Sequence, residues 1–378
     1  MKQLIVGSDF SGVGAFDQAL ERLGLKYKTA FACDQDKYAR QTYIENYGEP
    51  EYFPDNVYNR DIPKESLDIY MSSPPCQAFS MSGLRLGKED KRGILFFNSL
   101  EFIKKNKPRY AIFENVRGLV SHDKGNTFKE WLDLLGGKSV NGVMTMCPSE
   151  DSVPYHIHWE VINAKHHGVP QNRERVFIVC IRDDQDNNFE FPEKETLNKK
   201  LRDILQDQVD EKHYLSDKML EKITYKVKLN EDKKVAEVAN LNKGGQKGPV
   251  YSYYTDYMSC LTATDYKQPK QIMLPIKSAT KRGFELAKEG DSINFTHPNS
   301  KTRRGRVGKE VAQTLDTACS QATYIFGKVR RLTPTECFRL MDFKDDFKWS
   351  CSDTQAYKQA GNSIVVRVLE KIINNLNL

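Results

Sequence analysis

The first residues of the chain predict a strand, a glycine turn and a helix. Gln3 to Phe10 form an apolar strand pattern, and Ser11-Gly12-Val13-Gly14 lead into a helix that we expect to end near Gly24. Glycines let a ligand approach the backbone, and a helix N-terminus offers free N–H groups. The pattern Phe-x-Gly-x-Gly lacks the third glycine of the dinucleotide fingerprint, so it predicts a nucleotide-binding α/β sheet without identifying the cofactor.

Acidic residues follow this turn at a spacing typical of nucleotide sites. The next predicted strand, 29–33, ends in Asp34-Gln35-Asp36, and a helix is expected at 37–47. A carboxylate about 20 residues after a glycine turn can accept hydrogen bonds from ribose hydroxyls. Asp61, next to Ile62, is placed to accept from an adenine amino group. Each acid also fits a helix cap or a surface charge, but their order after the turn favours cofactor binding.

A cysteine between a strand and a polar loop is the second constraint. Residues 67–71 predict a buried strand, and Ser72-Ser73-Pro74-Pro75-Cys76-Gln77 follow it. The prolines stiffen the chain and cannot continue a strand ladder. Ligands of open α/β sheets lie beyond the carboxyl ends of the strands, so we expect Cys76 to project into that crevice. An ordinary loop is the alternative.

Three charged residues are expected near the same sheet edge. Glu114 ends a predicted strand at 110–113, where a carboxylate could instead cap a helix or form a salt bridge. Arg173 and Arg175 lie between predicted strands at 157–163 and 176–182. Because they alternate along the chain, we expect both to share a face and point at one anion.

The positive charge of the chain is concentrated in one segment. The whole chain carries a net charge of +6, yet residues 240–309 hold 13 Lys and Arg against 5 Asp and Glu, while the remainder holds 44 against 46. A surface that meets a polyanion has this character, as does an ordinary solvated face. Residues 78–93, with four basic side chains, predict a second basic loop.

The remaining composition narrows the class of protein. Eight cysteines without a CxxC pair disfavour a zinc site or disulfide scaffold and suit a reducing cytosol. The His156–His158 and His166–His167 pairs are expected to be surface residues, and we expect no metal. No apolar run is long enough to span a bilayer, and no signal-peptide pattern is present, so we expect a cytoplasmic protein.

The C-terminal residues predict two helices. A capped helix is expected from Arg331-Leu332-Thr333-Pro334-Thr335-Glu336 to Met341, and an amphipathic helix from Ile364 to about Leu376. We expect the last helix to pack on the first domain, which would bring Asn362 and Ser363 near the cofactor.

Taken together and in order, these motifs resemble those of the DNA (cytosine-5)-methyltransferases of bacterial restriction–modification systems. The resemblance runs from Asp9 to Leu376 and is carried by seven motifs. They are Phe10-x-Gly12-x-Gly14, Pro75-Cys76-Gln77, Arg92-Gly93-x-Leu95-Phe96-Phe97, Glu114-Asn115-Val116, Gln171-x-Arg173-x-Arg175, Arg331-Leu332-Thr333-Pro334-x-Glu336-Cys337 and Gly361-Asn362-Ser363. Ser73-Pro74 departs from the Gly-Phe or Gly-Pro of many members.

The resemblance implies an α/β, Rossmann-like S-adenosylmethionine-dependent sheet with a smaller, irregular target-recognition domain. Residues 1–190, completed by 331–378, would form the catalytic domain, and residues 191–330 the recognition domain. Methyl transfer to C5 of a flipped cytosine in duplex DNA is implied, with Cys76 as nucleophile and Glu114, Arg173 and Arg175 as further catalytic residues. No general base for removal of the C5 proton is assigned.

Further residues and partners are implied in the same way. The expected contacts of S-adenosylmethionine are Phe10, Ser11, Gly12, Val13, Gly14, Asp34, Gln35, Asp61, Ile62, Pro75, Leu95, Asn362 and Ser363. The expected DNA contacts are Ser80, Ser82, Arg92, Lys243, Gln246, Arg303, Arg304, Arg306, Thr314 and Leu315. We favour Thr314-Leu315 over Leu261-Thr262 as the stretch behind the flipped base. A monomer with a cognate restriction endonuclease as genetic partner is implied.

Three other functions are compatible with part of the sequence. An RNA cytosine-5 methyltransferase would share the scaffold but lacks a large recognition domain. A catalytically silent DNA-binding regulator is disfavoured by the presence of Cys76, Glu114 and both arginines. A nicotinamide-dependent oxidoreductase would explain only the glycine turn.

Overall fold

A computed structural model describes residues 3–75, 94–225, 235–239, 250–254 and 271–378. The chain divides into two compact units. The first comprises Met1–Val169, Arg173–Leu197 and Met341–Leu378, and the second comprises Pro170–Asn172 and Asn198–Leu340. Sequence analysis places the changes of domain at 190 and 331, whereas the compact units change after Leu197 and after Leu340. No helix among the described residues is long and apolar enough to cross a membrane.

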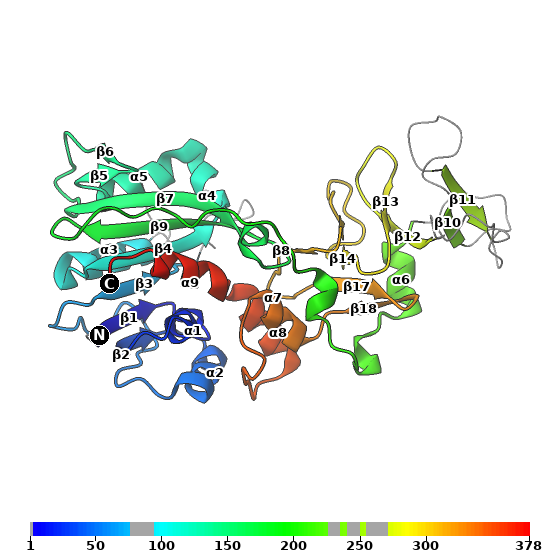
Figure 1. The fold of residues 1–378 in the computed structure, drawn as a ribbon, viewed down its shortest axis with the longest axis horizontal. Helices are drawn as coiled ribbons and strands as arrows, with labels where there is room; N and C mark the ends of the chain where they lie inside the picture. Colours follow the sequence, from blue (N-terminus) through cyan, green and yellow to red (C-terminus); the bar gives the residue numbers. More distant parts are fainter. Residues whose placement is uncertain (1–2, 76–93, 226–234, 240–249, 255–270) are drawn as a thin grey trace. The chain divides into compact units, whose positions relative to one another are not determined.

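An eight-stranded sheet forms the centre of the first unit (Figure 1), in the order β2-β1-β3-β4-β9-β7-β5-β6. The strands are β1 Leu4–Asp9, β2 Tyr27–Cys33, β3 Ile69–Ser72, β4 Tyr110–Val116, β5 Ser139–Val140, β6 Val143–Met144, β7 Tyr155–Asn163 and β9 Glu174–Arg182. Strands β2, β1, β3 and β4 run parallel, and β9 is antiparallel to both β4 and β7. This is the α/β sheet that the sequence predicts.

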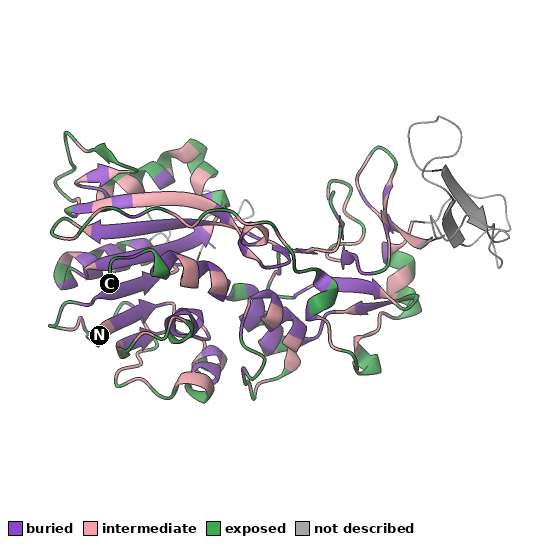
Figure 2. Ribbon diagram, viewed as in Figure 1, coloured by how far each residue is buried: buried purple, intermediate pink, exposed green. Residues whose placement is uncertain are grey.

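Register along the parallel strands fixes one common edge. Asp9 pairs with Cys33 and with Ser72, and Ser72 pairs with Phe113. The residues after Asp9, Cys33 and Ser72 therefore leave the sheet at its carboxyl edge, whereas β4 continues to Val116 and carries Glu114 within the strand. Figure 2 shows that the middle strands behind this edge are buried. The sequence predicts that Glu114 lies at the same sheet edge as the end of the strand before Cys76. The register agrees, because Glu114 directly follows Phe113, which pairs with the last residue of β3.

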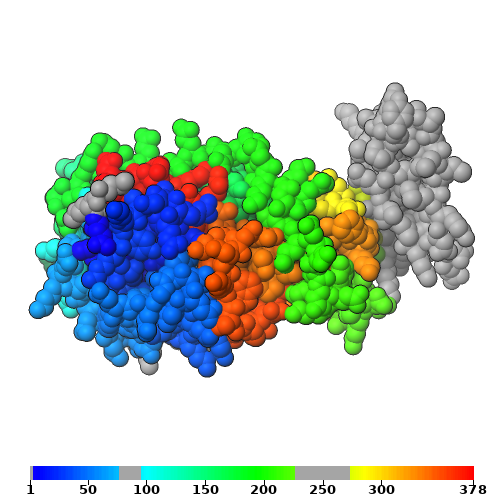
Figure 3. Space-filling view, turned by 60° about the horizontal axis from the view of Figure 1, so that its bottom comes forward, coloured from blue at the N-terminus to red at the C-terminus, as the bar shows by residue number. Residues whose placement is uncertain are grey.

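Helices surround the sheet. They are α1 Ala15–Arg22, α2 Lys37–Tyr47, α3 Ile94–Asn106, α4 Gly118–Ser121, α5 Asn126–Leu135, α8 Asp353–Asn362 and α9 Val366–Asn374. Short 3₁₀ turns follow α4 and β7. The amphipathic C-terminal helix α9 buries Val366, Leu369 and Ile373 and packs on α1, so N- and C-terminal residues lie together (Figure 3). Helix α8 was not predicted as a separate helix.

The second unit is built mainly of short antiparallel strands. One sheet has the order β11-β10-β12-β13, another the order β15-β14-β17-β18, and β8 pairs with β16 in parallel. Its strands are β8 Gln171–Asn172, β10 Val235–Ala239, β11 Val250–Tyr254, β12 Gln271–Lys277, β13 Phe284–Ala287, β14 Ser292–Asn294, β15 Val307–Gly308, β16 Ala312–Gln313, β17 Gln321–Ile325 and β18 Lys328–Arg331. Its helices are α6 Asp217–Ile223 and α7 Pro334–Leu340. A small core around Ile276, Ile293 and Ala322 holds it together.

Helix α7 begins as the sequence predicts. The Thr333 hydroxyl accepts from the Glu336 N–H at 3.2 Å, and the Glu336 carboxylate accepts from the Thr333 N–H at 2.8 Å. This reciprocal pair is a capping box, which satisfies two backbone donors that a helix start leaves open.

Candidate active site

The glycine turn after β1 presents open backbone. Phe10, Gly12 and Gly14 all have positive φ, at 57°, 55° and 83°. A side chain added at Gly12 would meet nothing within 4 Å, so the space outside this residue is free among the described residues. A Cβ at Gly14 would lie 2.2 Å from the Tyr47 ring, so this glycine is required by packing as well as by φ. Val13 between them is buried.

The segment after β2 braces this turn. The Ser11 N–H donates to the Cys33 carbonyl at 3.0 Å, and the Gly12 N–H donates to an Asp34 carboxylate oxygen at 2.8 Å. The other Asp34 oxygen accepts from the Asp36 N–H at 2.8 Å. Burial raises the pKa of Asp34, and these two hydrogen bonds oppose the rise. Asp34 thus holds the turn in shape, a contact that the sequence did not predict.

Other expected cofactor contacts have varied environments. Asp61 is exposed, and its N–H donates to the Tyr52 hydroxyl at 2.9 Å. Gln35, Pro75 and Asn362 are exposed, Ile62 and Leu95 are half-buried, and Ser363 is 9% exposed. Ile62 and Leu95 also pack on the core.

The segment that leads to Cys76 is held on both sides. The Ser73 hydroxyl donates to the Phe10 carbonyl at 3.4 Å, and the Asn115 amide donates to the Pro74 carbonyl at 3.0 Å. The backbone before Cys76 is therefore tied to the glycine turn and to β4. Cys76 itself lies outside the described residues, as do Ser80, Ser82, Arg92, Lys243 and Gln246.

Glu114 is a buried carboxylate with an arginine partner. It is 8% exposed, and its Oε1 lies 3.0 Å from Nε of Arg175. In the antiparallel pairing of β4 and β9, Val116 lies opposite Arg175, so the side chains of Glu114 and Arg175 meet diagonally on one face. Burial raises the pKa of Glu114, and the charges of Arg175 and then Arg173 oppose the rise. Burial and the two guanidinium charges thus act in opposite directions on this carboxyl group.

Arg173 has a different partner from Arg175. Its Nη2 donates to the backbone carbonyls of Gly361 at 3.0 Å and Ser363 at 2.8 Å, and the residue is 2% exposed. Strand β9 begins only at Glu174, so strand alternation does not extend to Arg173. Arg173 thus holds the backbone on either side of Asn362, whereas Arg175 pairs with Glu114.

In the second unit, the three predicted arginines differ in exposure. Arg304 is exposed and its Nε donates to the Ala279 carbonyl at 3.1 Å, while Arg303 is half-buried. Arg306 is only 2% exposed and donates to the carbonyls of Asn294, Thr296 and His297 at 3.1, 2.9 and 2.6 Å. The prediction that Arg306 faces a DNA groove is not supported by this geometry, because the side chain is buried and both Nη atoms donate to carbonyls inside the unit.

The Thr314-Leu315 stretch is anchored to β8. The Thr314 hydroxyl donates to the Asn172 carbonyl at 2.7 Å, and the Leu315 N–H donates to the Gln171 side chain at 3.3 Å. Thr314 is exposed and Leu315 is buried. The parallel pairing of β16 with β8 thus brings this stretch to the residues that precede Arg173 in the chain.

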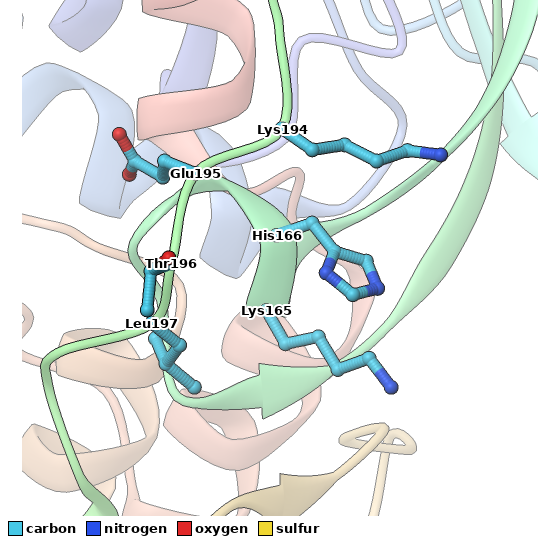
Figure 4. A pocket seen from close by; sticks show the side chains of 6 residues that line it. All are labelled: Lys165, His166, Lys194, Glu195, Thr196 and Leu197. Atoms are coloured by element: carbon cyan, nitrogen blue, oxygen red, sulfur yellow. The ribbon is translucent and has the colours of Figure 1, made fainter.

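A shallow pocket of about 470 Å³ lies elsewhere on the first unit. It is lined by Lys165, His166, Lys194, Glu195, Thr196 and Leu197 (Figure 4). None of the predicted site residues lines it, so it plays no part in the predicted site. Among the described residues, no group of three or more His, Cys, Asp or Glu side chains is placed to hold a metal ion.

Comparisons with known proteins agree on one family. A family model described as C-5 cytosine-specific DNA methylase matches residues 6–377. The orphan methyltransferase M.SPRI of Bacillus phage SPR is 31% identical over 446 aligned residues that cover 100% of this chain and 98% of its own. The type II methyltransferase M.HhaI of Haemophilus parahaemolyticus is 31% identical, with coverage of 97% and 92%.

Solved structures share the fold. A putative DNA modification methyltransferase encoded within an E. coli prophage superposes with a TM-score of 0.60 at 18% identity and covers 99% of this chain and 98% of its own. The S. pombe Dnmt2 methyltransferase gives a TM-score of 0.55 at 17% identity, with coverage of 98% and 97%. The family model spans nearly the whole chain, and this protein belongs to the C-5 cytosine-specific DNA methylase family.

Proposed function

We propose that the protein transfers the methyl group of S-adenosylmethionine to C5 of a cytosine flipped out of duplex DNA. The observation that carries this proposal is the alignment of four strand ends at one sheet edge, which groups the open glycine turn, Asp34, the segment before Cys76 and the Glu114–Arg175 pair. A stacked cytosine cannot reach such a site, so the base must leave the duplex.

S-adenosylmethionine fits the glycine turn. Gly12 leaves open space, and among the described residues no side chain caps the N-terminus of α1 at Gly14. We propose that Phe10, Gly12, Gly14, Asp34 and Asp61 hold the cofactor, with Asn362 and Ser363 beside them. When bound, S-adenosylmethionine supplies an electrophilic methyl group on its sulfonium.

Cys76 and Glu114 act on different atoms of the cytosine. Thiolate addition of Cys76 at C6 breaks the C5–C6 double bond and makes C5 enamine-like, hence nucleophilic. Glu114 holds N3 and the exocyclic amine and stabilises the charge that develops in the ring. Arg175 keeps the Glu114 carboxylate in place. C5 would take the methyl group that the sulfonium supplies, and the sulfur would leave as the thioether S-adenosylhomocysteine. A base would then accept the C5 proton, and elimination of the thiolate restores the C5–C6 double bond and frees Cys76.

Substitution of the two reacting side chains tests this mechanism. In Cys76→Ser, methyl transfer to duplex DNA is abolished because the strong nucleophile is lost, while cofactor binding survives. In Glu114→Gln, turnover falls about 10²–10³-fold with DNA binding retained. Transfer of a labelled methyl group measures both. Cys147→Ser alters an exposed cysteine and serves as control. Normal turnover by Cys76→Ser would refute the covalent mechanism.

We also propose that the second unit recognises a specific duplex sequence through Arg303, Arg304 and the Thr314-Leu315 stretch.

The protein would act as a monomer in the bacterial cytoplasm, at the nucleoid, and protect host DNA in a restriction–modification system. It is similar to one relative named an orphan methyltransferase and to another named a type II methyltransferase. Bisulfite sequencing of DNA from expressing cells gives the methylated site, and digestion with an endonuclease of that specificity tests protection. Methylation of RNA in place of duplex DNA would overturn the proposal.

A further inference from the structure

A buried ion pair joins three segments of the proposed cofactor site. Asp9 is the last residue of β1, and the Arg60 guanidinium donates to both of its oxygens, at 2.6 Å from Nε and 2.5 Å from Nη2. The Tyr70 hydroxyl on β3 donates to the same carboxylate at 2.5 Å. The side chains of Arg60 and Asp9 are 3% and 0% exposed, so the pair is withdrawn from water.

Stability alone does not account for such a pair. The cost of taking two charges out of water often cancels their attraction, and apolar replacements of a buried pair are frequently as stable. What a two-pronged arginine–carboxylate contact supplies is fixed position and orientation. The guanidinium is held further by Phe102 and Phe31, whose ring centres lie 4.5 Å and 5.7 Å away.

Each member of the pair adjoins a proposed cofactor contact. Asp9 immediately precedes Phe10, whose φ is 57°, and Arg60 immediately precedes the exposed Asp61. The pair therefore ties the segment that carries Asp61 to the end of β1, where the glycine turn starts. Tyr70 adds the strand that continues toward Cys76.

We propose that Arg60 is a positioning residue, which acts through Asp9 to set the distance between the glycine turn and Asp61 in the S-adenosylmethionine site. This inference rests on the proposed function, because it assumes that the cofactor binds at these two segments. Arg60 itself is buried and does not touch the cofactor. Its loss leaves both segments present but free to shift, and a shift of about 1 Å can cost about 10²-fold.

Arg60→Lys tests the positioning role, because an ammonium keeps the charge but lacks the two-pronged geometry. We expect the Kd of S-adenosylhomocysteine, measured by calorimetry without DNA, and the KM for S-adenosylmethionine to rise about tenfold or more. The Kd for duplex DNA is expected to stay unchanged. Arg330→Lys is the matched control, since Arg330 in the second unit also makes a two-pronged contact, through Nη1 and Nη2, with Glu336 at 2.8 and 2.7 Å, and the two side chains are likewise 3% and 0% exposed.

A double variant separates positioning from charge burial. Asp9→Asn with Arg60→Met removes both charges together, so we expect its Tm to return toward that of the original protein while the Kd of S-adenosylhomocysteine stays raised. A double variant with restored Tm and unchanged Kd overturns the inference, as does Arg60→Lys if it loses no more affinity than Arg330→Lys. If the unaltered protein fails to bind S-adenosylhomocysteine, the proposed function falls and the inference falls with it.

Discussion

Asp17 gives a quantitative prediction for the helix that follows the glycine turn. It lies in the first turn of α1, is 2% exposed and accepts from the Tyr43 hydroxyl at 2.6 Å. Its second oxygen is buried and has no hydrogen-bond partner among the described residues. Burial raises the pKa of Asp17 from 3.8 to about 6, and the bond from Tyr43 only partly offsets this rise. The ionised carboxylate therefore destabilises the folded state near neutral pH.

The sign and size of the effect follow from linkage. The pKa of Asp17 is higher in the folded than in the unfolded protein, so its protonation stabilises the folded state. This contribution is fully present below pH 3.8 and is lost as pH rises through about 6. A difference of about two pKa units corresponds to about 3 kcal/mol at pH 7. Asn resembles the protonated acid in shape and keeps an oxygen to accept from Tyr43. We expect Asp17→Asn to be more stable than the unaltered protein by about 3 kcal/mol at pH 7, and by under about 1 kcal/mol at pH 4.

Urea unfolding at several pH values measures this difference. The free energies of unfolding of the two proteins are compared between pH 4 and pH 8, with the same buffer ions and ionic strength. Asp133→Asn, at an exposed position of α5, is the control because it makes the same substitution outside the core. A constant difference between Asp17→Asn and the unaltered protein across this range would refute the reasoning.

Two more predictions come from the glycine turn and the second unit. Gly14→Ala places a Cβ against the Tyr47 ring at a φ of 83°, so we expect a loss of about 1–3 kcal/mol in the free energy of unfolding and weaker cofactor binding; unchanged calorimetric affinity would contradict it. Replacement of Arg303 and Arg304 by Ala should reduce the slope of DNA affinity against salt concentration by the equivalent of about two phosphate contacts, measured by titration at several salt concentrations. An unchanged slope would mean that these two arginines contact solvent and not DNA. Arg306→Met should instead lower the free energy of unfolding, measured in urea, by about 2–4 kcal/mol, because the buried carbonyls lose their hydrogen-bond donor. A variant as stable as the unaltered protein would contradict this structural role of Arg306.

Much of the catalytic unit follows from local pattern. The helix at 37–47 has the predicted bounds, and the strands around 29–33, 110–113 and 157–163 are present but longer at their ends. Apolar runs and glycine turns report on strands and helix starts because they act within a few residues. The parallel register then brings the ends of these strands together, so the grouping of the glycine turn with Glu114 needed no distant contact to be predicted. Helix α8 was missed because its sequence, Asp353–Asn362, has only a weak apolar stripe.

The fate of individual charged side chains was decided by tertiary structure. Arg306 and Arg304 are two residues apart in one basic stretch, yet one is buried on three carbonyls and the other is exposed. Arg60 and Asp9 lie 51 residues apart and meet only because β1 and the segment after β2 converge at the sheet edge. The partners of Arg173 come from the far end of the chain. The sequence by itself determined which segments form the main strands of the sheet and which residue types follow their ends, whereas the order of the strands came from the structure. Only the folded chain decided which charges are buried, because burial and pairing depend on neighbours that are distant in sequence.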